Sequence, residues 1–144
     1  MRLFRQDTKV QALANAPIFE GLSKKELTQL ARVTDDVEVD AGTVLCREGR
    51  TENEFFVIMD GEVEVTRSGR RIERGGGGDF FGEIALIADI PRTATVTTTT
   101  PVRLFVLTGP AFWQMLDDLP AVERKVLRTL AKRLVAASAD PSLG

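Results

Sequence analysis

Residues 81–96 read FGEIALIADIPRTATV, and this stretch decides how the rest of the chain is interpreted. Gly82 lets the backbone approach a ligand closely, and the residues after it can begin a short helix whose first amides bind an anion. Arg92 follows a return at Pro91, and its guanidinium can hold two oxygens of a phosphate. Glu83 only accepts hydrogen bonds when ionised, which suits a sugar hydroxyl. Together these residues predict a cradle for a sugar phosphate.

On both sides of this stretch, apolar and polar residues alternate with a period of two. The alternation begins near residue 36 and is interrupted by turn signals such as Ala41-Gly42, Asp60-Gly61 and Ser68-Gly69. Short strands with regular turns are typical of an all-β sandwich or barrel. Asp60-Gly61 lies between two apolar segments and predicts a tight hairpin. The four consecutive glycines at 75–78 predict a loosened loop.

Helical patterns lie toward both ends of the chain. Within residues 8–34, the clearest signal is a capping box that begins at Ser23 and ends at Glu26. Thr108 can cap a further helix, and a second one runs from about residue 121 to 137. The order of elements predicts a mainly β protein with flanking helices. We expect an eight-stranded antiparallel β-roll (a double-stranded β-helix of the jelly-roll type), with N-terminal helices and two C-terminal helices.

The last predicted helix is basic on one side and apolar on the other. Residues 123–133 contain five basic and one acidic side chain. The apolar stripe predicts that this helix packs on the β core and directs its cations to solvent, which disfavours a nucleic-acid surface.

The composition limits the possible functions. The chain has 144 residues, with 43% hydrophobic and 28% charged, which is ordinary for one globular domain. Its net charge of −2 provides no basic footprint for nucleic acid, and the lack of His excludes imidazole chemistry. We interpret Cys46 as a small buried hydrophobe. No segment approaches the roughly 20 apolar residues of a membrane span, and no signal peptide is evident, so we expect a cytoplasmic protein.

The stretch from residue 81 to 96 resembles the phosphate-binding cassette of the cyclic nucleotide-binding domain family. This family includes the catabolite activator protein, the regulatory subunits of cyclic-nucleotide-dependent kinases and the nucleotide-gated channels. The resemblance covers residues 17–138 and leaves an N-terminal helical extension at 1–16 and a tail at 139–144. It also includes the glycine turns at Gly42, Gly49 and Gly61, the entry at residues 78–83, and the helix at residues 130–134.

The resemblance implies a cyclic mononucleotide as the ligand and no catalytic residue, metal or further cofactor. By analogy, Glu83 accepts from the ribose 2′-hydroxyl and Arg92 pairs with the cyclic phosphate. The backbone amides of Gly82, Ile84 and Ala85 complete the phosphate site. The other binding residues that it implies are Phe81, Thr93, Ala94 and Ser138.

The identity of the base is less clearly indicated. In kinase-type members, a Thr at the position of Thr93 goes with cGMP and an Ala with cAMP, but other members combine a hydroxyl with cAMP. We favour cAMP and leave cGMP open. In the family the last helix covers the base, so we expect Leu130 and Leu134 to become buried when it closes. Only Ser138 keeps a hydroxyl there, because the preceding position is Ala137.

Other functions fit less well. A metal-dependent enzyme on a related double-sheet fold would lack its histidine ligands, and a transcription factor would need a helix-turn-helix that is not visible. One alternative stays open, a degenerate domain that keeps the fold and binds a protein without any nucleotide. For a sensor module, an effector domain, a protein partner and a homodimer also stay open.

Overall fold

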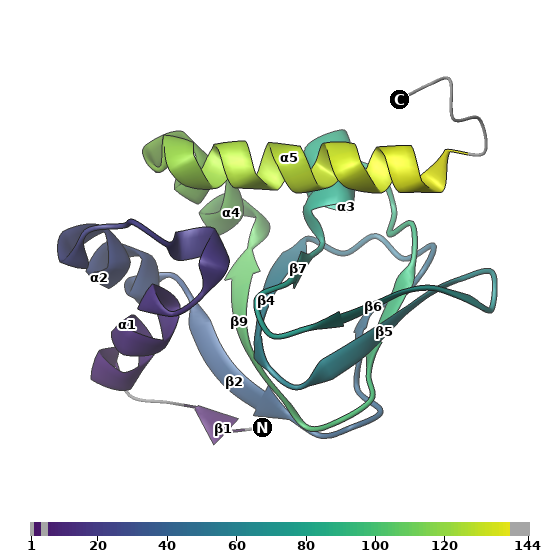
Figure 1. The fold of residues 1–144 in the computed structure, drawn as a ribbon, viewed down its shortest axis with the longest axis horizontal. Helices are drawn as coiled ribbons and strands as arrows, with labels where there is room; N and C mark the ends of the chain where they lie inside the picture. Colours follow the sequence, from purple (N-terminus) through teal and green to yellow (C-terminus); the bar gives the residue numbers. More distant parts are fainter. Residues whose placement is uncertain (1, 4–5, 139–144) are drawn as a thin grey trace.

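The computed structural model describes residues 2–3 and 6–138, with side chains described for residues 8–138. Two antiparallel sheets form a roll, a group of helices lies at one side of it, and one long helix crosses its top (Figure 1). The predicted tail at residues 139–144 lies outside the described residues.

Three short helices precede the roll. They are α1 (Gln6–Ala14), the 3-10 helix η1 (Pro17–Phe19) and α2 (Lys24–Arg32). The capping box at the start of α2 is confirmed. The Ser23 hydroxyl accepts from the Glu26 amide at 3.1 Å, and the Glu26 carboxylate accepts from the Ser23 amide at 2.9 Å. Helix α2 therefore begins where the capping box in the sequence predicts.

The described strands form two sheets, in the orders β1-β2-β9-β4-β7 and β3-β8-β5-β6. Their bounds are β1 (Arg2–Leu3), β2 (Asp35–Val39), β3 (Val44–Cys46), β4 (Glu54–Asp60), β5 (Glu62–Arg67), β6 (Arg70–Gly76), β7 (Phe80–Phe81), β8 (Thr95–Thr98) and β9 (Val102–Thr108). Strands β2 to β9 make up the predicted eight-stranded antiparallel roll, which is confirmed. Strand β1 adds a short edge next to β2 in a region predicted to be helical.

The turn at Asp60-Gly61 is a sheet crossing, and the prediction of a hairpin there is wrong. Strand β4 pairs with β7 and β9, whereas β5 pairs with β6 and β8. Gly61 has φ of +102°, and a Cβ at this residue would lie 2.4 Å from the Pro101 carbonyl oxygen. The chain crosses between the sheets at Gly61 and again at Pro101, and these two segments pack too closely for a side chain at residue 61. Crossings of this kind form the corner between two packed sheets. A true two-residue hairpin lies at Ser68-Gly69, where both φ angles are positive.

The four-glycine run is more ordered than predicted. Gly75 and Gly76 belong to β6 and pair with Val63 and Glu62. A Cβ at Gly75 would lie 2.6 Å from the Cζ atom of Phe81. The glycine is therefore required because the Phe81 ring packs directly on the strand.

Both faces of the first sheet are buried. Along β4, Phe55 and Val57 pack against the helices, while Phe56 and Ile58 point into the roll. Leu13 of α1 belongs to the same cluster as Phe55, so the N-terminal extension packs with the rest of the fold. Sheets with two covered faces have strands that read as continuous apolar runs, as β4 does.

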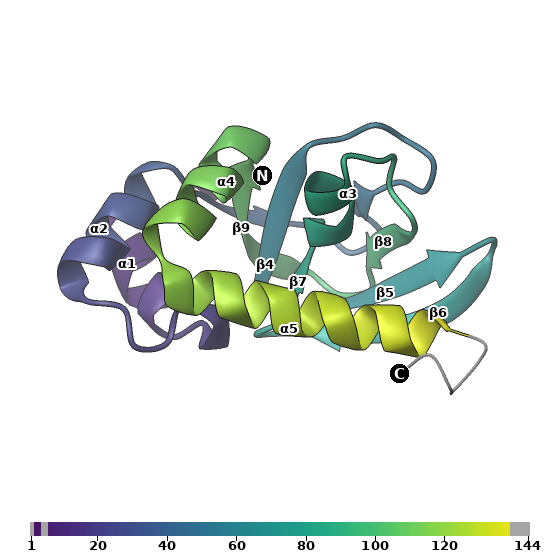
Figure 2. The same ribbon diagram turned by 90° about the horizontal axis from the view of Figure 1, so that it is seen from above.

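Three helices follow the cassette and the last strand: α3 (Glu83–Ala88), α4 (Gly109–Asp118) and α5 (Pro120–Ala137). Helix α5 crosses the top of the roll and passes beside α3 (Figure 2). Val122 and Val126 in its first half are buried, whereas Leu134 and Val135 are 61% and 58% exposed. The predicted packing of α5 on the core thus holds only for its first half.

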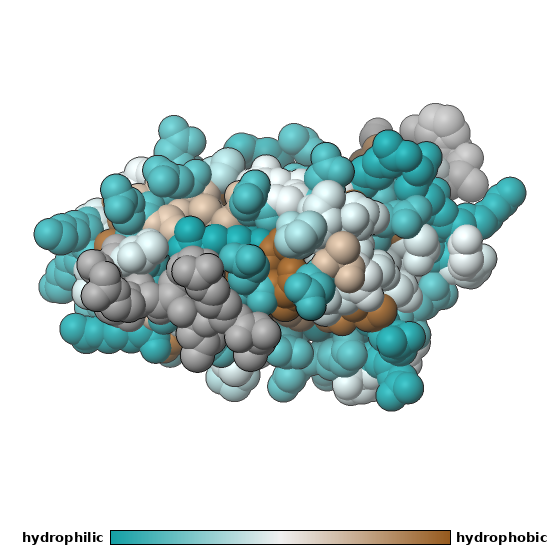
Figure 3. Space-filling model, turned by 90° about the horizontal axis from the view of Figure 1, so that it is seen from below, coloured by the Kyte–Doolittle hydropathy of each residue, from teal (hydrophilic) through white to brown (hydrophobic). Residues whose placement is uncertain are grey.

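The face opposite α5 is largely hydrophilic, with apolar surface near its centre and toward its lower right edge (Figure 3). None of the helices in the described part of the chain has the length and apolar character that a membrane crossing requires.

Candidate functional site

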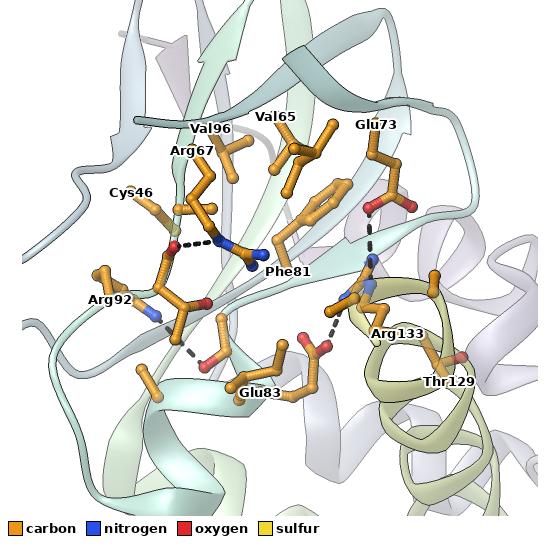
Figure 4. Close-up of a pocket in the computed structure, with 18 of the residues that line it drawn as sticks. Cys46, Val65, Arg67, Glu73, Phe81, Glu83, Arg92, Val96, Thr129 and Arg133 are labelled. Atoms are coloured by element: carbon orange, nitrogen blue, oxygen red, sulfur yellow. Dashed lines mark hydrogen bonds and ion pairs between the residues drawn. The ribbon is translucent and has the colours of Figure 1, made fainter. Parts of the chain in front are cut away.

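A cavity of about 970 Å³ lies between the roll, α3 and the second half of α5 (Figure 4). Eight of the nine predicted binding residues line it: Phe81, Gly82, Glu83, Ile84, Ala85, Arg92, Thr93 and Ala94. The fold brings them together because β7 and α3 lead into the cavity and the chain returns along it into β8. Ser138 is not among the residues that line the cavity.

Glu83 is the most unusual residue of the cavity. Its side chain is fully buried, and one carboxylate oxygen accepts a hydrogen bond from Nη1 of Arg133. The other oxygen, Oε2, is buried and has no hydrogen-bond partner among the described residues. Buried polar atoms are nearly always paired, and each exception needs an explanation. A hydroxyl donor supplied by a ligand would pair this atom.

Arg133 of α5 reaches into the cavity rather than into solvent, so that part of the sequence prediction is wrong. Its Nη2 donates to the Phe80 carbonyl at 2.7 Å, and its Nε lies 3.8 Å from Oε2 of Glu73. Its guanidinium carbon also lies 4.6 Å from the centre of the Phe81 ring, within the range of a cation–π contact. The helical pattern alone could not reveal this, because the second half of α5 faces a cavity instead of an apolar core.

Arg92 is almost completely buried, with 4% of its surface exposed. Its Nη2 donates to the Glu54 carbonyl at 2.7 Å, its Nη1 to the Gly82 carbonyl at 3.3 Å, and its Nε to the Glu52 carboxylate at 3.3 Å. A guanidinium has five N–H groups, so these contacts leave one on each terminal nitrogen. The side chain is thus held in place and can still bind an anion.

Gly82 is required at its position for two reasons. Its φ is +105°, and a Cβ there would lie 2.6 Å from the Glu54 carbonyl oxygen and 2.9 Å from Nη1 of Arg92. As the N-cap of α3, it precedes amides that come before the first intrahelical bond, which runs from Leu86 N to Gly82 O at 3.4 Å. Amides in this position are free to bind an acceptor.

The loop between β3 and β4 also holds Arg92, a role that the sequence analysis did not predict. The Gly49 amide donates to the Arg92 carbonyl at 2.8 Å, and the Arg92 amide donates to the Arg50 carbonyl at 2.9 Å. Glu52 of the same loop is the ion-pair partner of the side chain. Nothing in the sequence signals these contacts, because the loop lies about 40 positions earlier in the chain.

Arg67, at the end of β5, is a second residue that the sequence analysis missed. Its Nε donates to the Thr93 carbonyl at 2.9 Å, and its guanidinium points into the cavity above Phe81 (Figure 4). No local pattern distinguishes it from the exposed arginines of the same hairpin.

Cys46 lies in the wall of the cavity and is buried, as predicted. Burial raises the pKa of its thiol to about 12, with nearby Arg92 opposing the shift. A thiol with so high a pKa is a poor nucleophile.

Leu134 is largely exposed and Leu130 is partly buried, and their expected burial when α5 closes over a base stays a prediction. Ser138 caps the end of α5, with its amide donating to the Val135 carbonyl at 3.1 Å, and it lies one position beyond the last residue that lines the cavity.

The comparisons with known proteins identify this architecture. The model of the cyclic nucleotide-binding domain matches residues 36–118, which extend from within β2 to the end of α4 and include the whole cassette. The chain belongs to the cyclic nucleotide-binding domain family.

A curated cyclic nucleotide-gated potassium channel of Rhizobium etli is 34% identical over 85% of this chain and 34% of its own length. The chain thus spans about a third of the length of this relative. Among solved structures, the chain is similar to a cAMP-binding acyltransferase of Mycobacterium smegmatis (32% identity, TM-score 0.75, 91% of this chain and 42% of that chain). It is also similar to the regulatory subunit of a cAMP-independent protein kinase A from Trypanosoma brucei (27% identity, TM-score 0.78, 87% and 45%).

Proposed function

We propose that this chain is a sensor module that binds a 3′,5′-cyclic nucleotide, cAMP or cGMP, in the cavity beneath α5. The observation that carries the proposal is the unpartnered, fully buried oxygen of Glu83, which faces the same cavity as Arg92. A cyclic nucleotide offers a ribose hydroxyl for the first and an anionic phosphate for the second.

The phosphate would bind at the cassette. Arg92 keeps one N–H on each terminal nitrogen, and these two donors match two phosphate oxygens. The backbone amides of Gly82, Ile84 and Ala85 would supply further donors, as the family resemblance implies. Because Arg92 already has Glu52 as a counterion, it would bind the phosphate as a fixed donor group and not as an unpaired charge.

The ribose would bind at Glu83 without displacing Arg133. Arg133 contacts Oε1, and Oε2, which is buried and has no partner among the described residues, would accept from the 2′-hydroxyl. The ligand would therefore connect the cassette to α5 through one carboxylate and one arginine. Binding would favour the arrangement in which the second half of α5 lies over the cavity, which is a shift of population that requires tighter binding to this closed state.

The first experiment is isothermal titration of nucleotide-free protein with cAMP and with cGMP. Micromolar binding of either nucleotide would support the sensor proposal. Absence of heat from folded, nucleotide-free protein would support the alternative of a protein-interaction domain.

Arg92→Lys tests the phosphate site, because it keeps the charge and removes the planar fork. We expect affinity to fall about 100-fold for both nucleotides, the size of loss that follows removal of a charge-assisted contact in a desolvated site. Arg50→Lys in the neighbouring loop is the control, and its thermal stability and affinity should match the parent. Unchanged binding by folded Arg92→Lys would disprove the assignment of the phosphate site.

The domain boundaries and the output are also proposals. We propose that residues 17–138 form the nucleotide-binding domain and that a partner or an effector region reads the position of α5. The proposal of an effector region is supported by the Rhizobium etli channel, whose own chain is about three times as long as its matched part.

A further inference from the structure

The wall of the cavity formed by β5 and β6 carries charged groups that the proposed function does not use. Four side chains of this hairpin line the cavity, and we call them the β5–β6 wall: Val65, Arg67, Ile72 and Glu73. The cassette and α5 account for the phosphate and ribose, so the base remains to be placed. The β5–β6 wall is one part of the cavity lining that can face the base.

Arg67 offers hydrogen-bond donors that the protein leaves unused. Its Nε–H bonds the Thr93 carbonyl at 2.9 Å, which fixes the direction of the guanidinium. No other side-chain hydrogen bond or ion pair of Arg67 occurs among the described residues. Apolar side chains surround the end of the side chain, namely Val65, Phe81 and Val96 (Figure 4). Because Arg67 is only partly buried, its remaining donors are accessible to the acceptors of a ligand that fills the cavity.

Glu73, from the other strand of the hairpin, offers acceptors. Figure 4 places its carboxylate on the far side of Phe81 from Arg67. Its contact with Arg133 is long, at 3.8 Å, and its side chain is 43% exposed. The carboxylate can therefore accept hydrogen bonds from a ligand without leaving a buried charge unpaired.

We infer that the β5–β6 wall selects guanine over adenine, with Arg67 facing O6 and N7 and Glu73 facing the N1 and N2 donors. The inference rests on the proposed function. Guanine presents two adjacent acceptors, O6 and N7, which a guanidinium binds as a pair, whereas adenine has an amino group in place of O6. If the amino group of adenine faced Arg67, two groups of hydrogen-bond donors would meet with no acceptor between them. This assignment differs from the preference for cAMP that we drew from the sequence.

The test is a comparison of cGMP, cAMP and inosine 3′,5′-cyclic monophosphate by isothermal titration. We expect the parent protein to bind cGMP at least about tenfold more tightly than cAMP, the discrimination expected of one bidentate arginine contact. The inosine nucleotide keeps O6, N7 and N1–H but lacks the N2 amino group. Its affinity should lie between those of cGMP and cAMP, because it loses only part of the contact with Glu73.

Two variants locate the selectivity. Arg67→Gln should remove most of the preference for cGMP while changing cAMP affinity less than threefold. Glu73→Ala should abolish the difference between cGMP and the inosine nucleotide, because it removes the acceptor for the N2 amino group. Arg70→Gln is the matched control, because Arg70 lies on the same hairpin, is exposed and does not line the cavity.

The outcomes separate this inference from the proposed function. Failure of all three nucleotides to bind the folded parent protein would overturn the proposed function and with it the inference. Equal or tighter binding of cAMP would overturn the guanine inference alone. So would an equal loss of cAMP and cGMP affinity in Arg67→Gln, since this would assign Arg67 to the phosphate. Thermal melting of each variant identifies any that has failed to fold, and Arg67→Met then replaces Arg67→Gln.

Discussion

Asp36 and Glu83 are both fully buried carboxylates, yet their surroundings differ in one decisive respect. Asp36 of β2 binds Arg103 of β9 through both oxygens, at 3.0 and 2.6 Å. Glu83 binds Arg133 through one oxygen, and the other has no partner among the described residues. A saturated buried ion pair has no capacity left for a ligand, whereas a half-satisfied one does. The comparison separates a structural carboxylate from a functional one.

Arg103 is the basic partner of Asp36 in this structural ion pair. The hydrogen bond to Asp36 raises the pKa of the Arg103 guanidinium, and partial burial opposes this shift. The pair connects two neighbouring strands of the first sheet, on the opposite side of β9 from β4. We therefore expect its loss to change the stability of the roll and to leave the cavity intact.

The largest effect is expected from Asp36→Ala. Removal of one partner leaves Arg103 without its bidentate acceptor, and breaking a buried pair in this way costs about 3–5 kcal/mol. Because the Arg103 side chain is 25% exposed and can reach water, we expect a loss near the lower end of that range. Urea unfolding measures it, and the nucleotide affinity of the folded fraction should not change. A stability loss below about 1 kcal/mol would contradict the structural role assigned to the pair.

We expect a smaller effect from Glu83→Gln, and we expect it on nucleotide affinity instead of stability. The amide keeps the shape of the side chain but weakens its bond to a ribose hydroxyl. A hydrogen bond to a charged group contributes roughly 1.5–3 kcal/mol, so nucleotide affinity should fall about 10- to 100-fold. Stability should change by less than about 1 kcal/mol, because Arg133 keeps its bond to the Phe80 carbonyl. If stability falls as in Asp36→Ala while affinity is unchanged, the distinction between the two carboxylates is wrong.

The link from Glu83 to α5 can be tested with Arg133→Met. Methionine keeps an apolar stem over the Phe81 ring and removes the bonds to Glu83 and Phe80. We expect faster hydrogen exchange after residue 129, no change around the buried Val122 and Val126, and weaker protection by nucleotide. Lys132→Met is the control in the same segment. Equal exchange in parent and variant would mean that Arg133 does not hold this half of the helix.

The smallest effect concerns Cys46, a third buried ionisable group, which has no acidic or basic side chain bound to it. Burial raises its pKa from 9.0 to about 12 in the folded protein. Below pH 9 both folded and unfolded chains keep the thiol protonated. Between pH 9 and about 12 only the unfolded chain ionises, so stability should fall with rising pH more steeply in the parent than in Cys46→Ala. Parallel pH profiles of melting temperature would show that the thiol does not contribute.

The sequence predicted the parts of the molecule that depend on local patterns. The capping box at Ser23 and Glu26 is confirmed because its two hydrogen bonds join residues three positions apart. The roll is confirmed because alternating strands with frequent turns can bury their apolar faces in few other ways. The predicted cassette residues at 81–85 and 92–94 lie along one cavity because the two segments are close together in the chain.

The errors lie where distant segments meet. Asp60-Gly61 has the local signature of a hairpin, but the contact with Pro101 makes it a corner between sheets. The glycine at 75 has the signature of a loop, but the ring of Phe81 requires it within a strand. In both cases the residue type follows from a neighbour that is close in space and distant in sequence, which no local pattern contains.

The sequence by itself determined the fold, the family and the short segment that can hold a phosphate and a ribose, because each of these depends on periodicity or on adjacent residues. Only the tertiary structure decided which charged side chains face that segment. Arg67 and Arg133 have ordinary sequence surroundings, and they become part of the site because the hairpin and α5 turn them toward one cavity. A side chain's partner across a cavity is set by the packing of whole elements, and this packing is a property of the folded chain alone.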